Sequence, residues 1–459
     1  MKKVKCISPI DGSTYAERTC LNLTQAKEYV KRAKLVQKNW AQTPLQTRVD
    51  LVKAGVAKIG ELNDLIIPEL AWQMGRPIRY GGEFSGFSER ANYMASIASE
   101  ALSNIVVEDS KDFKRVIKRV PHGVVLVIAP WNYPFMTAIN TIAPALISGN
   151  SVVLKHASQT PIVGERIAEA FHSVGIPDHV FQNLTLDHET TTRLISSGFF
   201  NFVNFTGSVT GGKAMEAAAS GTFTSLGLEL GGKDPGYVME DANLDKAVET
   251  LIDGAMFNSG QCCCGIERIY VNQNLYNKFI EKAVKVVESY KLGNPLNQET
   301  TLGPMANIKL ANKVREQTRD AIALGARPLI DPLLFPEDDG AYLMPQILVD
   351  VDHSMTVMRD ESFGPVIGIM AVENDQEAID LMNDSPFGLT ASLWTQDAVR
   401  AEAIADQIES GTVFMNRADY LDPSLCWTGC KDTGRGGSLS IIGYHNLTRP
   451  KSYHLKIDT

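Results

Sequence analysis

What this sequence lacks excludes several classes of protein. No stretch approaches the run of about 20 apolar residues that a membrane-spanning helix needs, and no apolar signal region follows the basic start Met1-Lys2-Lys3-Val4-Lys5-Cys6. We therefore expect no membrane partner. Acidic and basic residues are interspersed and the net charge is −9, so no basic face is expected for nucleic acid. The sequence has no internal repeats or low-complexity tracts.

Cysteine is also scarce, with seven residues of which three are consecutive. Such a set does not form the disulfide framework of a small secreted protein, so we expect a reducing cytoplasm. Metal ligands usually come as spaced pairs such as C-x2-C with a second pair elsewhere. Cys426 and Cys430 are the only other close pair and have no histidine cluster nearby, so we predict no metal site.

The length and the pattern of the chain indicate an α/β protein of two or three domains. At 459 residues it exceeds one ordinary domain, and its 44% hydrophobic residues allow a sizeable core. From 124 to 231 short apolar runs alternate with amphipathic segments, which predicts a parallel sheet. The expected strands are 124–128, 151–154 and 202–205, and the expected helices are 138–147, 161–174 and 211–219. A similar block runs from 243 to about 436, with a turn-rich section within 331–340.

The most informative segment is Phe257-Asn258-Ser259-Gly260-Gln261-Cys262-Cys263-Cys264. Adjacent cysteines cannot easily pair with each other, because a disulfide needs a specific Cα and Cβ geometry. One interpretation is a thiolate nucleophile. The other is a buried apolar turn, since free cysteine packs like a small hydrophobe. The residues alone leave both open.

Two further polar residues stand in unusual places. Glu229 lies between two leucines and just before two glycines. Apolar surroundings raise the pKa of a carboxyl group through desolvation, so Glu229 can act as a base near neutral pH unless it is a solvated loop residue. Asn132 follows the apolar run 124–129, at the end where open α/β sheets place ligand groups. Its amide could donate to an oxyanion, although an asparagine between prolines is also a common turn residue.

Five motifs in order carry a resemblance to a known family. They are P-W-N-Y-P (130–134), F-T-G-S (205–208), L-E-L-G-G-K (228–233), F-N-x-G-Q-C-C (257–263) and E-x-F-G-P (361–365). Over nearly the whole chain this series resembles the aldehyde dehydrogenase superfamily, which implies NAD(P)-dependent oxidation of an aldehyde. The resemblance also implies two Rossmann-like parallel-sheet domains and a small β oligomerisation flap. The expected divisions are 1–104 with 122–231 for cofactor binding, 232–436 for catalysis, and 105–121 with 437–459 for the flap of a homodimer or homotetramer.

The resemblance also implies the catalytic roles. The family's nucleophile is the second residue after the Gly-Gln pair, which is Cys263 here. Cys262 and Cys264 are then expected as packing neighbours, because only one of three consecutive residues should face the substrate tunnel. Glu229 would be the base for thioester hydrolysis, and Asn132 with the backbone N–H of Cys263 would stabilise the oxyanion.

The implied contacts with NAD or NADP are Trp131, Lys155, Ser158, Gly207, Ser208, Leu230, Glu361 and Phe363. Lys155 would reach the adenosine ribose and any 2′-phosphate. NAD-preferring members typically carry a glutamate where this chain has Ser158, so we expect NADP to be slightly favoured. Ser208 would begin the helix whose N-terminus receives the pyrophosphate. Glu361 would hold the nicotinamide ribose, and Phe363 would back the ring.

The sequence departs from the family pattern at 182–191, where many relatives are glycine-rich, and at 426–431. Members that act on succinate semialdehyde often carry an arginine six residues before the nucleophile, where this chain has Phe257. Four more aromatic residues are expected near the tunnel: Trp131, Tyr133, Phe135 and Trp427. This composition suits an apolar, aromatic or semialdehyde-type substrate, or a quaternary ammonium aldehyde held by cation–π attraction.

Two other function classes stay open. A CoA-acylating semialdehyde dehydrogenase of the same superfamily uses a thiol in place of water, and relatives of that type commonly lack the glutamate found here as Glu229. A catalytically silent binding relative is the second alternative. The presence of Asn132, Cys263 and Glu361 together with Glu229 argues against it.

Overall fold

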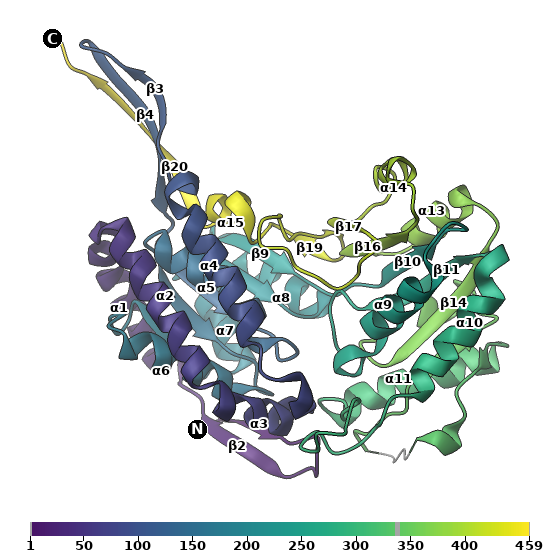
Figure 1. The fold of residues 1–459 in the computed structure, drawn as a ribbon. Helices are drawn as coiled ribbons and strands as arrows, with labels where there is room; N and C mark the ends of the chain where they lie inside the picture. Colours follow the sequence, from purple (N-terminus) through teal and green to yellow (C-terminus); the bar gives the residue numbers. More distant parts are fainter. Residues whose placement is uncertain (1, 336–339, 459) are drawn as a thin grey trace.

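The computed structural model describes residues 2–335 and 340–458, and two sheets of mainly parallel strands make up its body. Figure 1 shows these sheets side by side, with a narrow third sheet projecting from the half that carries the N-terminus. Positions 336–339 of the expected turn-rich section lie outside the described residues. Among the described residues, no helix is both long and apolar enough to cross a membrane.

The first sheet has the order β19-β9-β8-β5-β6-β7. Its strands are β5 (Val124–Ile128), β6 (Ser151–Lys155), β7 (Phe181–Asn183), β8 (Phe202–Thr206), β9 (Ser225–Glu229) and β19 (Gly434–Arg435). All neighbours are parallel except β19, which runs antiparallel to β9. The carboxyl ends of the parallel strands therefore meet at one edge, where the motif residues follow them.

Alternation along the strands explains why helices cover both faces of this sheet. Val124, Leu126 and Ile128 of β5 pack against one helical layer, while Val125 and Val127 pack against the other. The first layer contains α1 (Leu23–Gln42), α7 (His188–Ser196) and α8 (Val209–Ala219). The second contains α2 (Leu45–Glu61), α3 (Asn63–Met74), α4 (Phe84–Ala101), α5 (Pro134–Ile147) and α6 (Pro161–Ser173), with η1 (Ile78–Tyr80) between α3 and α4.

The second sheet has the order β12-β13-β14-β11-β10-β16-β17, with only β12 antiparallel to its neighbour. Its strands are β10 (Asp234–Val238), β11 (Ile266–Asn272), β12 (Arg327–Pro328), β13 (Gln346–Val349), β14 (Val366–Val372), β16 (Thr390–Trp394) and β17 (Thr412–Met415). Its helices are α9 (Leu244–Met256), η2 (Phe257–Gly260), α10 (Gln273–Glu288), α11 (Ile308–Ala323), η3 (Pro332–Leu334), α12 (Thr356–Arg359), α13 (Asp375–Asn383) and α14 (Ala398–Ala405). Tyr237 and Tyr270 pack on one face, and Val238 and Ile269 pack on the other.

The third sheet is antiparallel and pairs a strand near the C-terminus with two strands from residues 105–121. β4 (Phe113–Pro121) pairs with β3 (Ile105–Asp109) and with β20 (Thr448–Lys456), which follows α15 (Ser440–Asn446). Ser452 lies opposite Ile117 in this register. Two smaller pairs are β1 (Lys3–Ile7) with β2 (Thr14–Thr19), and β15 (Phe387–Gly388) with β18 (Cys430–Lys431).

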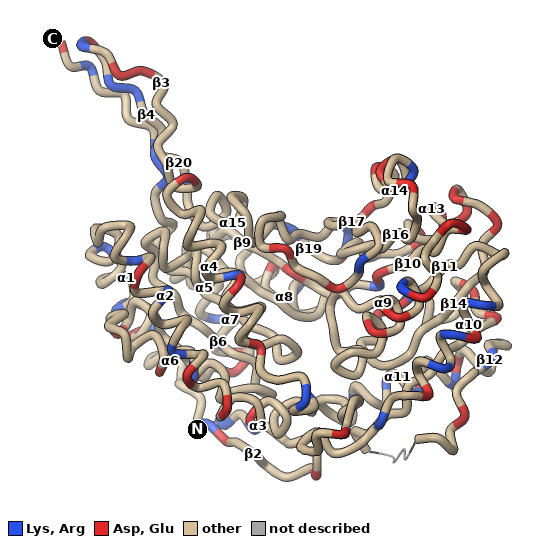
Figure 2. Tube along the Cα trace, viewed as in Figure 1, with Lys and Arg blue, Asp and Glu red and all other residues tan. Residues whose placement is uncertain are grey.

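The expected strands and helices between 124 and 219 are confirmed, with small shifts at their ends. α5 begins at Pro134 and not at 138, because proline suits the first turn of a helix. α8 begins at Val209 and not at 211, because the Ser208 side chain accepts the Gly211 N–H and caps the helix. Figure 2 shows acidic and basic residues interspersed over both halves of the body.

Candidate active site

The three cysteines lie in a strained loop between α9 and β11. Asn258, Ser259 and Gly260 have φ of 54°, 57° and 70°, which is the left-handed region. A Cβ on Gly260 would meet the Gly364 backbone at 2.3 Å, so only glycine fits this approach. The Gln261 side chain locks the loop by accepting the Ala306 N–H at 2.8 Å and donating to the Asn258 carbonyl at 3.0 Å.

The thiols of the triplet point in different directions. Cys262 and Cys264 are 5% and 1% exposed, and their Sγ atoms lie 3.5 Å apart. Both contact Oδ1 of Asp419, at 3.2 and 3.0 Å. Asp419 and the two thiols are also a group whose ligand atoms lie close enough for a metal ion. Thiol hydrogen bonds to the carboxylate account for these contacts by themselves. Cys263 is more accessible than its two neighbours.

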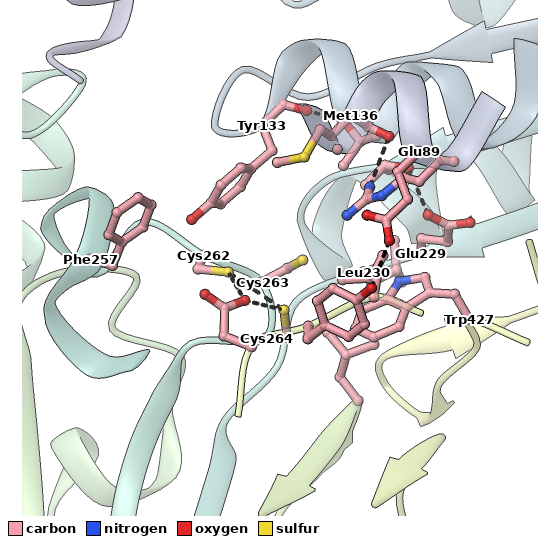
Figure 3. Close-up of a pocket in the computed structure, with 18 residues that line it drawn as sticks. Glu89, Tyr133, Met136, Glu229, Leu230, Phe257, Cys262, Cys263, Cys264 and Trp427 are labelled. Atoms are coloured by element: carbon pink, nitrogen blue, oxygen red, sulfur yellow. Dashed lines mark hydrogen bonds between the residues drawn. The ribbon is translucent and has the colours of Figure 1, made fainter. Parts of the chain in front are cut away.

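Two cavities meet at Cys263. One, of about 250 Å³, is lined by the whole triplet together with Tyr133, Phe257 and Trp427 (Figure 3). The other, of about 210 Å³, is lined by cofactor motif residues. Thr206, Glu229, Leu230 and Cys263 line both. The expectation that only one thiol faces the tunnel is wrong, since all three line its wall, but only Cys263 also reaches the second cavity.

The surroundings of Cys263 favour its thiolate. The adjoining thiols of Cys262 and Cys264, the Cys264 backbone and the positive charge of Arg90 lower the pKa of Cys263 below its ordinary value. The pKa values of Cys262 and Cys264 are raised, first by their interaction with the other thiols of the triplet and then by burial and the Asp419 charge. Of the three thiols, Cys263 is therefore the one set up to ionise and react.

Glu229 ends β9 at the junction of the two cavities. Burial raises the pKa of this carboxyl to about 7, against the hydrogen bond that it accepts from Thr206. Thr206 Oγ1 donates to Oε2 at 3.3 Å. The next motif residues explain the close packing here, because a Cβ on Gly232 would meet the Cys263 carbonyl oxygen at 2.6 Å. A carboxyl with this pKa can take a proton near neutral pH.

Asn132 is buried in the loop after β5 and lines the cofactor cavity. Its Nδ2 donates one hydrogen to the Gln261 carbonyl at 3.1 Å, which leaves the second hydrogen of the amide available. Its backbone carbonyl accepts from Arg76 Nη2 at 2.6 Å and from Asn258 Nδ2 at 3.3 Å. These contacts hold the asparagine against the nucleophile loop.

Buried ion pairs hold the motif loops in place. Arg76 Nη1 lies 2.6 Å from Glu83 Oε1, and Glu83 Oε2 accepts the backbone N–H groups of Phe135 and Met136 at 2.9 and 2.8 Å. Glu83 thus provides an acceptor for two N–H groups in the first turn of α5, which have no partner within the helix. No motif in the sequence indicated this pair.

A second buried pair fixes the loop that carries Glu361 and Phe363. Lys233 Nζ lies 2.6 Å from Glu267 Oε2, and Glu267 accepts the backbone N–H groups of Ser362 and Phe363 at 2.7 and 2.8 Å. The last residue of the L-E-L-G-G-K motif therefore positions the E-x-F-G-P motif.

Six of the expected cofactor residues line one cavity: Trp131, Gly207, Ser208, Leu230, Glu361 and Phe363. The Trp131 and Phe363 rings meet edge to face with centroids 5.6 Å apart. Burial raises the pKa of Glu361 to about 7, and its Oε1 accepts the Gly232 N–H at 3.1 Å.

The other two lie elsewhere, at the carboxyl end of β6. Ser158 lines a small pocket together with residues 183–186, so the atypical segment forms part of its wall. Lys155 is 5% exposed, and its ammonium has no hydrogen bond or ion pair with the described residues. Burial lowers the pKa of Lys155.

The aromatic wall is only partly as expected. Phe257, Tyr133 and Trp427 line the substrate-side cavity, and Figure 3 shows them around the triplet. Phe135 does not, because it is fully buried against Phe87 in the core. Trp131 lines the cofactor cavity instead.

Sequence reasoning missed Asp419 and Arg90 in the substrate-side cavity. Nothing in the local sequence marks Asp419. Arg90 had a detectable signal, because it shares the buried face of α4 with Phe87, Ala91 and Met94. A charged residue on an apolar helical face needs a partner or a function.

Comparisons with known proteins agree with the geometry. The model of the aldehyde dehydrogenase family matches residues 1–453. The chain is 32% identical to the Escherichia coli succinate semialdehyde dehydrogenase [NAD(P)+] Sad over 89% of this chain and 88% of that protein. It is 29% identical to a Rhizobium leguminosarum betaine aldehyde dehydrogenase over 98% and 93%. The solved structure of PnpE in complex with nicotinamide adenine dinucleotide aligns with a TM-score of 0.94 at 26% identity, covering 100% and 95% of the two chains.

Proposed function

Because the chain belongs to the aldehyde dehydrogenase family, we propose that it oxidises an aldehyde to a carboxylic acid with NAD⁺ or NADP⁺ as hydride acceptor. The observation that carries this proposal is the meeting of two cavities at Cys263 and Glu229. A nucleophile and a base at such a junction can act on a substrate from one side while a cofactor reaches it from the other.

The first step is addition of the Cys263 thiolate to the aldehyde carbon. A C–S bond forms, the C–O π bond breaks, and the carbonyl oxygen becomes an oxyanion. The free hydrogen of the Asn132 amide and the backbone N–H of Cys263 stabilise that charge, each by about 3 kcal/mol. The lowered pKa of Cys263 keeps the attacking sulfur ionised.

The cavity beside Cys263 fits a nicotinamide cofactor. The Glu361 carboxyl, with its raised pKa, is placed for ribose hydroxyls, and Trp131, Leu230 and Phe363 offer apolar surface for the ring. Gly207 and Ser208 place the N-terminus of α8 at the same cavity, where backbone N–H groups attract phosphate. The bound cofactor would accept the hydride that leaves the substrate carbon. The carbonyl then re-forms as a thioester on Cys263.

Glu229 completes the cycle. Its carboxylate takes a proton from water, the hydroxide adds to the thioester carbon, and the C–S bond breaks to return the Cys263 thiolate and release the acid. With a pKa raised to about 7, Glu229 can both accept and release a proton near neutral pH. The same placement favours water over CoA as acyl acceptor.

Steady-state assays with a panel of aldehydes, both cofactors, and CoA present or absent test the proposal. We expect reduced cofactor to form with no need for CoA. No reduction of either cofactor with any aldehyde would contradict it, and strict dependence on CoA would establish the acylating alternative.

The adenosine end supports use of NADP. Lys155 offers a buried positive charge without a counterion among the described residues, and Ser158 replaces a carboxylate that would repel a 2′-phosphate. Asp187, in the neighbouring atypical segment, has its own counter-charge, because its Oδ2 lies 2.9 Å from Lys2 Nζ.

The division into domains follows the three large sheets except near the C-terminus, where β19 pairs with β9 of the first sheet and α15 packs against the helices of that sheet. We assign 1–104 and 122–231 to cofactor binding, 232–436 to catalysis, and 105–121 with 437–459 to an oligomerisation flap. The flap supports a homodimer or homotetramer, because Ile105, Val106 and Val107 are about 60% exposed on its edge strand β3. Sedimentation analysis of the full chain measures the assembly. All seven cysteines are free, which supports a reducing compartment such as the cytoplasm.

A further inference from the structure

The substrate-side cavity contains a buried cation, Arg90, whose only role so far is to favour the Cys263 thiolate through its charge. Arg90 projects from α4, is 7% exposed, and lines the cavity with Cys263. Its Nη1 donates to the Met136 carbonyl at 2.9 Å and to Asn140 Oδ1 at 3.4 Å. Within residues 2–335 and 340–458, the Nε and Nη2 atoms of Arg90 have no hydrogen-bond partner, and neither atom is fully buried. An arginine keeps its charge even at such a site.

Two other cations near the catalytic loops, Arg76 and Lys233, are buried together with a carboxylate. Each lies 2.6 Å from its partner, Glu83 or Glu267. No carboxylate in the described part of the chain lies within ion-pair distance of Arg90. Leaving a buried charge uncompensated costs several kcal/mol. A counter-charge supplied by a ligand removes that cost.

The carboxyl groups that share the cavity do not serve as its counter-charge. Asp419 receives the Cys262 and Cys264 thiols. Glu229 receives Thr206. Glu89, one residue before Arg90, accepts the Tyr420 hydroxyl at 2.8 Å. The Nε and Nη2 atoms of Arg90 form one edge of the guanidinium, which is the edge that can hold both oxygens of a carboxylate at once.

The named relatives leave the charge of the substrate open, because one acts on succinate semialdehyde and the other on betaine aldehyde. Phe257 stands where an arginine would be expected for the first of these. Arg90 on α4 lines the same cavity and supplies a positive charge that Phe257 does not. The apolar rings of Phe257 and Trp427 line the same cavity and suit the methylene chain between the two ends of a substrate.

We propose that the Nε–Nη2 edge of Arg90 binds the distal carboxylate of the substrate, so that the enzyme acts on an aldehyde whose far end is a carboxylate. The inference rests on the proposed aldehyde oxidation and specifies its substrate class. The cavity of about 250 Å³ suits a short chain, such as the semialdehyde of a four- to six-carbon dicarboxylic acid.

The test compares succinate semialdehyde with butanal, which has the same number of carbons and no carboxylate. The wild type should have the higher kcat/KM for the semialdehyde. Arg90→Met should lower that kcat/KM roughly 10- to 100-fold more than it lowers the value for butanal, mainly through KM, and the loss common to both aldehydes measures what the Arg90 charge contributes to the Cys263 thiolate. Arg90→Lys should fall between them, because it keeps the charge and loses the two-pronged geometry.

Arg32→Met is the matched control, because it removes one positive charge from an exposed position on α1. It should leave both kcat/KM values unchanged. Retained butanal oxidation shows that Arg90→Met has folded. If that variant does not fold, Arg90→Lys and the wild-type preference decide the question.

Three results would overturn the proposal. The first is a wild type that prefers butanal. The second is an equal loss for both aldehydes in Arg90→Met with a shifted pH profile of Cys263 alkylation, which would make Arg90 a positioning residue for the thiolate. The third is a preference for glyceraldehyde 3-phosphate over semialdehydes of every length. In each case aldehyde oxidation itself stands. A wild type that oxidises no aldehyde removes both the proposed function and this inference.

Discussion

The buried charges behind the catalytic loops differ from the charges that line the two cavities. Behind the loops, Arg76 and Lys233 each lie 2.6 Å from a carboxylate that also accepts two backbone N–H groups. At the cavities and the adenosine end, Arg90 and Lys155 have no such partner among the described residues. The carboxyl groups of Glu229 and Glu361 have raised pKa values through burial.

This difference separates framework from function. The paired cations already have a counter-charge within the fold, so removal of one partner should reduce stability. Unpaired or poorly solvated groups are held in costly environments that only a ligand or a reaction relieves. Changes on the cavity side should therefore alter activity or selectivity and leave unfolding nearly unchanged, and changes behind the loops should first reduce stability.

The largest effect is expected on the cavity side, at the nucleophile. Cys263→Ser should lower dehydrogenase activity by more than about 10³-fold, since a serine hydroxyl is not ionised near neutral pH. Urea unfolding should change little. Cys262→Ser and Cys264→Ser are the matched controls and should retain most activity. Iodoacetamide labelling with peptide mapping checks the assignment, and labelling of Cys262 or Cys264 with Cys263 untouched would contradict it.

Glu229→Gln should lower steady-state turnover by about 10²- to 10⁴-fold and leave a pre-steady-state burst of reduced cofactor. Acylation and hydride transfer do not need the carboxylate, so the thioester should accumulate. In the wild type, deacylation should rise with pH through about 7, because only the ionised form of Glu229 accepts a proton. The variant should lack that limb. Loss of the burst along with turnover would mean that Glu229 acts before hydrolysis.

The framework side predicts a loss of stability. Glu83→Gln leaves the buried Arg76 without its counter-charge and should lower the free energy of unfolding by about 3–5 kcal/mol. Urea titration followed by circular dichroism measures it. Glu165→Gln breaks the Arg18–Glu165 pair, whose side chains are each 37% exposed, and should cost less than about 1 kcal/mol. Equal losses of unfolding free energy in Glu83→Gln and Glu165→Gln would show that the buried pair contributes no more than the exposed pair.

The smallest effect is expected at the adenosine end. Ser158→Glu places a carboxylate opposite a 2′-phosphate and should shift the ratio of specificity constants toward NAD⁺ by about tenfold. Specificity constants for NADP⁺ and NAD⁺, measured for both proteins, give that ratio. A wild type that strongly prefers NAD⁺, with a ratio that Ser158→Glu leaves unchanged, would instead direct attention to residues 183–186 beside Ser158.

Strand and helix positions could be predicted because they depend on local patterns. The strand at Val124–Ile128 was located to the residue by its apolar run, and the helix ends shifted by a few positions where Pro134 and Ser208 set the first turn. The aromatic wall was harder to predict. Phe135 and Trp131 are close in sequence to Tyr133, but the turn into α5 sends the three rings to the core, the cofactor cavity and the substrate-side cavity.

The sequence by itself determined the alternation of strands and helices, the family motifs, and the candidates Cys263 and Glu229, because each is written in adjacent residues. Only the tertiary structure decided their surroundings. Asp419 reaches Cys262 across 157 positions of chain, and Arg76 reaches Asn258 across 182. Whether a buried charge such as Arg90 finds a partner depends on such distant contacts. The pKa, the pairing and the ligand of each buried group are therefore properties of the folded chain.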